Sequence, residues 1–172
     1  MNLRRISGLG LALAILAAGA AWAGQPDVWV TTKARIALLT ADDVSVTAVN
    51  VDTVDGNVTL HGKVKTEAEK GRAEAAVRGV EGVKSVKNLL QVVPEAFRDS
   101  VKVADEAIKD KVQATLKADP SLEGVKVASV NNGVVLLSGK TSTLGTKLRA
   151  IERAWEVSGV QRVASEIEAG EK

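Results

Sequence analysis

The chain has 172 residues, of which 45% are hydrophobic and 26% charged, and it contains three tryptophans, one phenylalanine and no cysteine or tyrosine. The lack of cysteine excludes disulfides, thiol catalysis and cysteine metal sites. A formal net charge of +2 gives no support for a general binder of nucleic acids or other polyanions. Because aromatic residues are so few, any core must be built from aliphatic side chains.

The first 23 residues have the pattern of a secretory signal peptide. Arg4 and Arg5 precede an uncharged run over residues 6–20, and Ala21-Trp22-Ala23 offers the small residues that signal peptidase recognises. The run is short for a membrane span, which needs about 20 residues. We expect cleavage after Ala23 and a soluble periplasmic protein without a lipid-modified N-terminal cysteine. Removal of Arg4 and Arg5 leaves 21 basic and 21 acidic residues.

One pattern occurs twice, 77 positions apart. Residues 54–63 recur as 131–140, and residues 82–86 recur as 159–163. The matched positions are Gly56, Gly62, Gly82 and Val86 in the first copy, and Gly133, Gly139, Gly159 and Val163 in the second. A period this long is too large for a solenoid unit and favours two small globular domains, each of about 70 residues and near the lower size limit for a stable core.

The first copy opens at Pro26-Asp27, a plausible N-cap region. Apolar residues at helical spacing then predict a helix to about Leu39. Residues 49–53 alternate like a half-buried strand, and Asp55-Gly56 favours a type I′ turn into a return strand.

The rest of the first copy predicts a second helix and a third strand. Thr66 and Glu69 form a capping box that opens the helix, and Gly82 is expected to end it. Residues 86–93 then predict the strand, which Pro94 ends.

The second copy repeats this order. It predicts a helix ended by Asp119-Pro120, strands over 125–130 and 134–137 joined at Asn132-Gly133, a second helix and a last strand over 163–167. Leu144-Gly145-Thr146 replaces the capping box, so we expect a looser start to that helix. The predicted fold class is α+β, with two domains of helix, strand, strand, helix, strand. In each domain, three strands form a small mixed sheet with both helices on one face.

The connection between the copies has its own pattern. Phe97, Val101, Ile108, Val112 and Leu116 share one helical phase, with no proline between Glu95 and Asp119. This predicts a joining helix of about 24 residues and about 36 Å. A break near Asp99 or Ser100, either of which could cap a new helix, is the alternative.

The chain resembles the BON domain family. The resemblance lies in the glycine turn before Val-x-Leu-x-Gly, at 56–62 and 133–139, and in Gly-Val-x-x-Val, at 82–86 and 159–163. It divides the chain into a signal peptide (1–23), a first BON domain (24–94), a helical linker (95–103) and a second BON domain (104–170). Similarity to tandem BON proteins of the osmotically inducible type implies a Gram-negative periplasmic location, no catalysis, and attachment to phospholipid surfaces or protection of the envelope under stress.

We expect no enzyme, no cofactor and no metal site. His61 is the single histidine, and Ser138 stands at the matched position, so neither copy depends on an imidazole there. We expect His61 to lie on the surface. None of the common hydrolase, phosphate-loop or metalloprotease motifs occurs.

The candidate lipid- or anion-binding residues are Lys63, Lys65, Lys140, Lys147, Arg149 and Arg153. Gly62-Lys63 and Gly139-Lys140 precede helix starts, where free backbone N–H groups favour an anion. The alternative is that the glycines permit a turn and the lysines are solvated. A local charge of +2 or +3, at about 1 kcal/mol per charge, gives binding weaker than about millimolar. Apolar insertion or engagement of both domains is therefore needed.

A candidate apolar contact patch comprises Trp29, Ile36, Leu39 and Trp155. The first three are matched by Ala107, Ala114 and Lys117 in the second copy, so the first helix has extra apolar surface. We expect the other domain or the joining helix to cover it, and a lipid or client-protein contact is the alternative. Trp155 is expected at the margin of its core.

Two functions follow as hypotheses. The first is a non-enzymatic periplasmic protein that associates weakly with phospholipid head groups, in envelope maintenance or osmotic stress. The second is a stress-protective chaperone that binds exported client proteins. Under both hypotheses the protein is peripheral rather than integral to the membrane, and it binds no nucleic acid.

Overall fold

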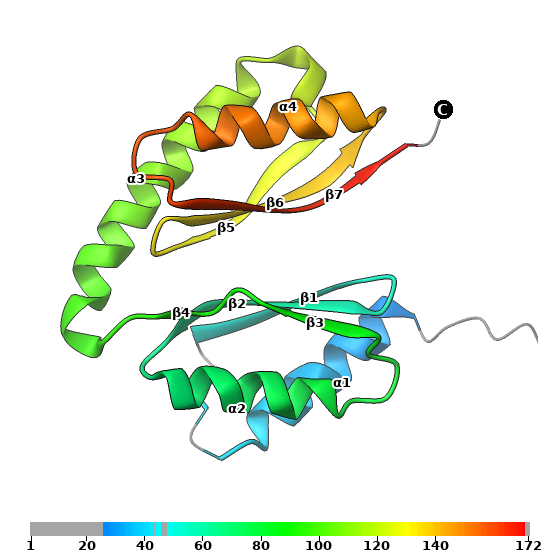
Figure 1. Ribbon diagram of the computed structural model, residues 1–172, viewed down its shortest axis with the longest axis vertical. Coiled ribbons are helices and arrows are strands. Elements are labelled where there is room, and N and C mark those ends of the chain that lie inside the picture. Colours follow the sequence, from blue (N-terminus) through cyan, green and yellow to red (C-terminus); the bar gives the residue numbers. More distant parts are fainter. Residues whose placement is uncertain (1–25, 43, 46–47, 171–172) are drawn as a thin grey trace, which may run out of the picture.

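The computed structural model describes residues 26–42, 44–45 and 48–170, and the expected signal peptide lies outside them. Two domains of the same element order are stacked with their sheets facing each other and their helices outside (Figure 1). Within the described part of the chain, none of the helices combines the length and the apolar character that crossing a membrane requires.

The first domain contains α1 (Asp27–Leu39), β1 (Val49–Val54), β2 (Asn57–Val64), α2 (Glu67–Arg78), β3 (Ser85–Asn88) and β4 (Gln91–Val92). β1 pairs antiparallel with β2, and β3 and β4 both pair parallel with β2. The single third strand expected over 86–93 is thus split. Asn88 causes the split, because its side-chain oxygen accepts from the N–H of Leu90 while its amide donates to Glu74 at 3.0 Å.

The second domain contains α3 (Arg98–Lys117), β5 (Val125–Asn131), β6 (Val134–Thr141), α4 (Leu144–Trp155) and β7 (Arg162–Ala169). β6 pairs antiparallel with β5 and parallel with β7, as the pattern predicted. The β5–β6 register shifts between Val127 and Ser129, a bulge with no counterpart in β1. Both hairpin turns have the expected positive φ values, 53° and 77° at Asp55-Gly56 and 48° and 74° at Asn132-Gly133.

The joining helix is continuous with the first helix of the second domain. A 3₁₀ turn, η2 (Glu95–Phe97), comes first, and α3 then runs unbroken for 20 residues, about 30 Å. The helix therefore begins three residues after the predicted start at Glu95. The alternative break at Asp99 or Ser100 is not seen, and the Ser100 hydroxyl instead donates to the Phe97 carbonyl.

The predicted cap of α2 is confirmed, with a variation. The Thr66 hydroxyl accepts from the N–H of Glu69 at 3.1 Å, whereas the Glu69 carboxylate accepts from the N–H groups of Ser45 and Lys65, each at 2.6 Å. Burial raises the pKa of Glu69, but the hydrogen bonds from Lys65 and Ser45 more than offset this and leave the pKa below its usual value. Glu69 thus ties the loop before β1 to the start of α2.

The predicted end of α2 at Gly82 is wrong. α2 ends at Arg78 with Gly79 as its C-cap, and Gly82 lies in the turn before β3 with a φ of +93°. α4 keeps a side-chain cap despite its different sequence, because the Thr143 hydroxyl accepts from the N–H of Thr146 at 3.1 Å.

Each domain has its own aliphatic core. The first domain buries residues of α1 and α2 against its sheet, among them Leu38, Leu60, Val77 and Leu90, and the second does the same with α3 and α4, among them Leu116, Leu122, Leu137 and Ile167. A third, small cluster of Leu89, Leu136 and Ala164 joins the two sheets on the faces that point away from the helices. The duplication therefore yields two cores and one shallow contact between them.

Gly62 and Gly139 are required by the sheet. They have φ values of +130° and +123°, and a Cβ at either position would lie 2.0 Å from a carbonyl oxygen, of Ala48 or of Gly124. Both glycines lie inside strands that continue to Val64 and Thr141, so they do not stand directly before the helix N-termini as predicted.

We expect Gly62→Ala to lower the free energy of unfolding by about 2 kcal/mol or more, because the methyl group meets backbone at a strained φ. Gly71→Ala in α2 is the matched control. Its Cβ would have no atom within 4 Å, so the change should raise stability by about 1 kcal/mol through helix propensity. Urea unfolding of both variants measures this, and equal effects would contradict the account of Gly62.

Candidate functional site

Asp105 joins three segments at the contact between the domains. Its carboxylate, on α3, accepts from the N–H groups of Asn132 and Gly133 at 2.9 and 3.0 Å, which fixes the β5–β6 turn. The Lys63 ammonium of β2, in the other domain, lies 2.7 Å from the same carboxylate. The Asp105 side chain is 6% exposed, so this ion pair is largely shielded from water.

Asp27 is the counterpart of Asp105 in the first domain. Its two carboxylate oxygens accept from the N–H groups of Asp55 and Gly56, each at 2.8 Å. The sequence had placed Asp27 in an N-cap region, but the N-cap is Pro26 and carries no side-chain cap. The sequence does contain a signal for these turn contacts, because an aspartate stands at the matched position of the first helix in both copies, Asp27 and Asp105.

His61 lies buried between the domains, contrary to the expected surface position. It is 6% exposed, and its Nε2 lies 3.0 Å from Asp52 Oδ2, a hydrogen bond that lowers the pKa of Asp52. The reason is that His61 projects from the face of β2 that the second sheet covers. It lines a groove of about 620 Å³ together with Asp52, Ser138 and Glu166, from both domains. The described residues include no cluster of three His, Asp or Glu side chains that could hold a metal.

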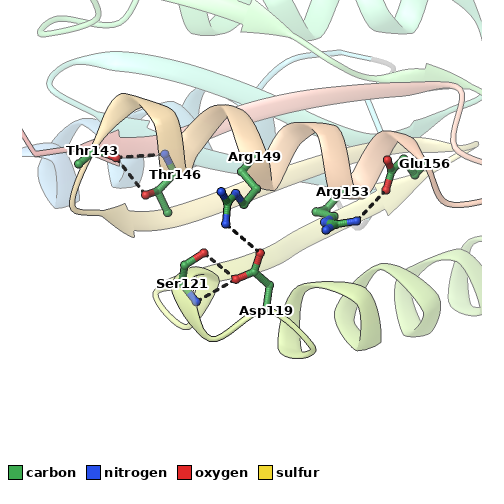
Figure 2. A network of polar contacts seen from close by, with 7 residues as sticks. All are labelled: Asp119, Ser121, Thr143, Thr146, Arg149, Arg153 and Glu156. Carbon is green, nitrogen blue, oxygen red and sulfur yellow. Dashed lines mark hydrogen bonds and ion pairs between the residues drawn. The ribbon is translucent and has the colours of Figure 1, made fainter.

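Arg149 and Arg153 of α4 are exposed on the surface of the second domain. Arg149 reaches Asp119 at 3.7 Å and Arg153 reaches Glu156 at 3.3 Å, as Figure 2 shows. Ser121 donates two hydrogen bonds to Asp119, and these, with the neighbouring Arg149, lower the pKa of Asp119. Lys147 is on the same helix. The two arginines are therefore exposed and each is paired with a nearby acid, whereas Lys147 is partly buried.

The other candidate cations are dispersed. Lys63 lies in the domain contact, Lys65 lies 3.6 Å from Glu95, and Lys140 pairs with Glu168 at 2.9 Å across the β6–β7 edge. Among the six candidate cations, Arg149 and Arg153 thus lie one turn apart on the same side of α4, whereas Lys147 lies on another side of that helix.

The candidate apolar residues stay on the surface. Trp29, Ile36 and Leu39 are 55%, 54% and 66% exposed, so among the described residues neither the other domain nor α3 covers them as expected. The reason is that the second domain packs on the sheet face opposite α1 (Figure 1). The Lys33 ammonium lies 5.9 Å from the centre of the Trp29 ring. On α4, Trp155 is 57% exposed and shares the surface with Leu144 and Leu148.

Comparison with known proteins agrees with this two-domain architecture. The BON domain family matches residues 26–94 and 104–171, nearly all of the described chain, so the chain belongs to the BON domain family, here in a tandem arrangement. It is 35% identical over 145 residues to osmotically-inducible protein Y of Escherichia coli, covering 82% of this chain and 71% of that protein.

A second relative is the outer membrane lipoprotein DolP of Haemophilus influenzae. It is 34% identical over 118 residues, which are 67% of this chain and 59% of DolP. Among solved structures, the C-terminal domain of CdsD, a structural protein of the type III secretion system of Chlamydia trachomatis, aligns with a TM-score of 0.33 and 16% identity, covering 80% of this chain and 63% of that one. That likeness is too slight to support any conclusion about this chain.

We expect Lys63→Met to lower the free energy of unfolding by about 2 kcal/mol, because Asp105 then keeps its two N–H donors but loses its buried counter-ion. Lys140→Met is the matched control, since Lys140 is the equivalent residue and its side chain is 80% exposed. It should cost less than about 1 kcal/mol. Urea unfolding separates the two cases, and a loss from Lys140→Met as large as that from Lys63→Met would refute the assignment.

Proposed function

We propose that the chain is a non-enzymatic protein of the bacterial cell envelope that associates weakly with phospholipid surfaces, in envelope maintenance or osmotic stress. Its two relatives support the envelope setting, because one is named for osmotic induction and the other as an outer membrane lipoprotein. Residues 1–23 would serve as a signal peptide cleaved after Ala23, and the mature protein would be periplasmic and peripheral to the membrane.

The observation that carries the proposal is the exposure of large apolar side chains on outer helices that also carry cations. Charges alone give only weak attraction, at about 1 kcal/mol for each net positive charge near an anionic surface. A Leu or Trp side chain that leaves water adds about 1.5–3 kcal/mol when it is fully buried. Trp29 on α1 and Trp155 on α4 are both more than half exposed and are available for such insertion.

The stacking of the domains limits how a membrane could be engaged. α1 and α2 lie on one outer side of the molecule and α4 on the opposite side (Figure 1). One flat bilayer therefore meets the helices of one domain at a time, which removes simultaneous binding through α1 and α4 as a source of affinity. Weak, reversible association through one apolar face is the mode that remains.

We expect the full chain to co-sediment with phosphatidylglycerol vesicles at low salt, and to do so less at 0.5 M salt because exposed charges are then screened. Vesicles of phosphatidylcholine are the control and should retain less protein. Absence of sedimentation with either lipid at both salt concentrations would end the proposal.

A periplasmic chaperone that covers exported client proteins is the second candidate. It is favoured by the exposed group of Trp29, Ile36 and Leu39, which the second domain does not reproduce at its matched positions Ala107, Ala114 and Lys117. An apolar surface that the fold does not require suits a transient protein contact.

If this candidate is correct, Trp29→Ala should weaken the suppression of client aggregation at least twofold while leaving thermal unfolding unchanged within about 0.5 kcal/mol. A light-scattering assay with a reduced, unfolding client protein measures the effect. Val103→Ala, at an exposed apolar position of α3, is the control and should change nothing. Undiminished suppression by Trp29→Ala would show that the exposed group of Trp29, Ile36 and Leu39 does not bind clients through Trp29.

A further inference from the structure

The free edge of β1 lies in a groove that both domains line, and we call it the β1 groove. Its volume is about 620 Å³, and residues 50–54 of β1 line it in an unbroken run. One side of α1 lines it as well, and so do Ser138 and Glu166 of the second domain. A chain segment in the β1 groove would therefore lie beside β1, between α1 and the second sheet.

The hydrogen bonds of β2 show which main-chain groups of β1 face this groove. Opposite residues of an antiparallel pair alternate between hydrogen-bonded and non-hydrogen-bonded pairs. The Leu60 carbonyl accepts from the N–H of Leu89 on the far side of β2, so its partner Val51 turns its own N–H and C=O toward the free edge. Thr53, two residues further on, has the same orientation. Among the described residues, the N–H and C=O groups of Val51 and Thr53 have no hydrogen-bond partner.

These unpaired groups are largely shielded from water. Val51 is 1% exposed and Thr53 is half-buried, although both line the β1 groove. A buried main-chain group without a partner is unfavourable to about the same extent as a lost hydrogen bond. A second backbone in extended conformation presents N–H and C=O groups at the matching spacing and would satisfy them. Thr53 is the more exposed of the two residues and so the first point of contact.

The other sheet edges carry features that hinder the addition of a strand. β3 and β4 are separated at Asn88, whose side-chain oxygen accepts from the N–H of Leu90. On β7, the Ser165 hydroxyl accepts from the N–H of Ile167 at 3.2 Å. β5 is interrupted by its bulge. β1 instead pairs with β2 in an unbroken register, so its edge is the one that can accept a further strand.

The matched groove of the second domain is smaller and already holds a side chain. It lies between α3 and β5 and has a volume of about 250 Å³. Lys63 of the first domain lines it and pairs there with Asp105. Lys140, the equivalent of Lys63, pairs with Glu168 and does not line the β1 groove. Of the two related grooves, the first therefore has the room for a chain segment.

The two sides of the β1 groove favour different side chains. Asp52 points toward the second sheet, where its carboxylate lies 3.0 Å from His61 Nε2. Glu166 lines the same side and has no ion-pair partner among the described residues. Alternate side chains of an added strand would face these two carboxylates, which favours basic residues. The remaining side chains would face α1, where Val28 is 79% exposed, which favours apolar residues.

We propose that the β1 groove binds an extended peptide segment of another protein, which joins the first sheet as a further strand and alternates basic with apolar residues. Val51 and Thr53 bind its backbone, and Asp52 and Glu166 select its basic side chains. The site is separate from the proposed association with phospholipid surfaces. Because α1 covers one face of the first sheet and the second domain the other, the same elements of a second folded copy would collide with them (Figure 1).

The test measures the binding of a fluorescein-labelled peptide that alternates lysine and valine, by fluorescence anisotropy with the full chain. Thr53→Pro removes the N–H on the free edge and leaves the pairing with β2 possible, so it should weaken binding about tenfold or more. Thr53→Val is the matched control. It keeps the N–H and loses the side-chain bond to Thr31, so it should bind as the wild type does. A peptide with glutamate in place of lysine should bind about tenfold more weakly than the lysine peptide.

Hydrogen exchange on the wild-type protein keeps the test decisive if Thr53→Pro disturbs the fold, which circular dichroism would reveal. The lysine peptide should slow exchange of the Thr53 amide about fivefold or more, as measured by NMR, because that N–H becomes hydrogen-bonded. The amide of Val130, at the matched position of β5, is the control and should exchange at an unchanged rate.

No binding of the lysine peptide by the wild type would overturn the proposal, and so would binding that leaves both Thr53→Pro and the exchange of Thr53 unchanged. Equal binding of the two peptides would overturn the selection by Asp52 and Glu166. Self-association that Thr53→Pro abolishes, without peptide binding, would assign the edge to a second copy instead. Vesicle binding is not altered by any of these results, so the phospholipid proposal is tested separately.

Discussion

The carboxylate of Asp105 is the point on which the arrangement of the molecule depends. It belongs to the helix that leaves the first domain, it holds the hairpin turn of the second domain through two N–H groups, and it accepts the Lys63 ammonium from the first domain's central strand. A residue that in the first copy only fastens a turn, as Asp27 does, has thus become in the second copy a link between domains. Because this carboxylate is almost fully buried, losing its lysine would leave a buried charge without its counter-ion, stabilised by the N–H groups of Asn132 and Gly133.

This link between the domains determines which surfaces are covered and which are exposed. The sheets face each other across a small contact of Leu89, Leu136 and Ala164, with His61 buried beside it, and the helices are turned outward. The helices are therefore the elements that the two domains present to their surroundings. The two copies differ most in that respect, with apolar surface on α1 in one and on α4 in the other, while their inward faces and glycine turns are alike.

Features encoded by neighbouring residues were predictable from the sequence, and features that depend on distant segments were not. The hairpin turns at Asp55-Gly56 and Asn132-Gly133, the strand directions and the start of α2 at Thr66 follow from local φ requirements, periodicity and capping. The burial of His61, the turn contacts of Asp27 and the exposure of Trp29 all depend on which sheet face meets the other domain, and no local pattern records that choice. The apolar positions Leu144 and Leu148 are visible in the sequence when the second helices of the two copies are aligned, because the first copy has Glu67 and Gly71 there.

The chain contains no cysteine, so pairs of spin labels can be placed at will. Labels on Gly71→Cys in α2 and Glu152→Cys in α4 report the separation of the two outer helical sides directly, and the distance distribution between them tests the stacking of the domains. A single narrow distribution, broadened when Lys63→Met is added, is the result expected of two sheets held face to face by Asp105. A broad distribution in the wild-type background would contradict it.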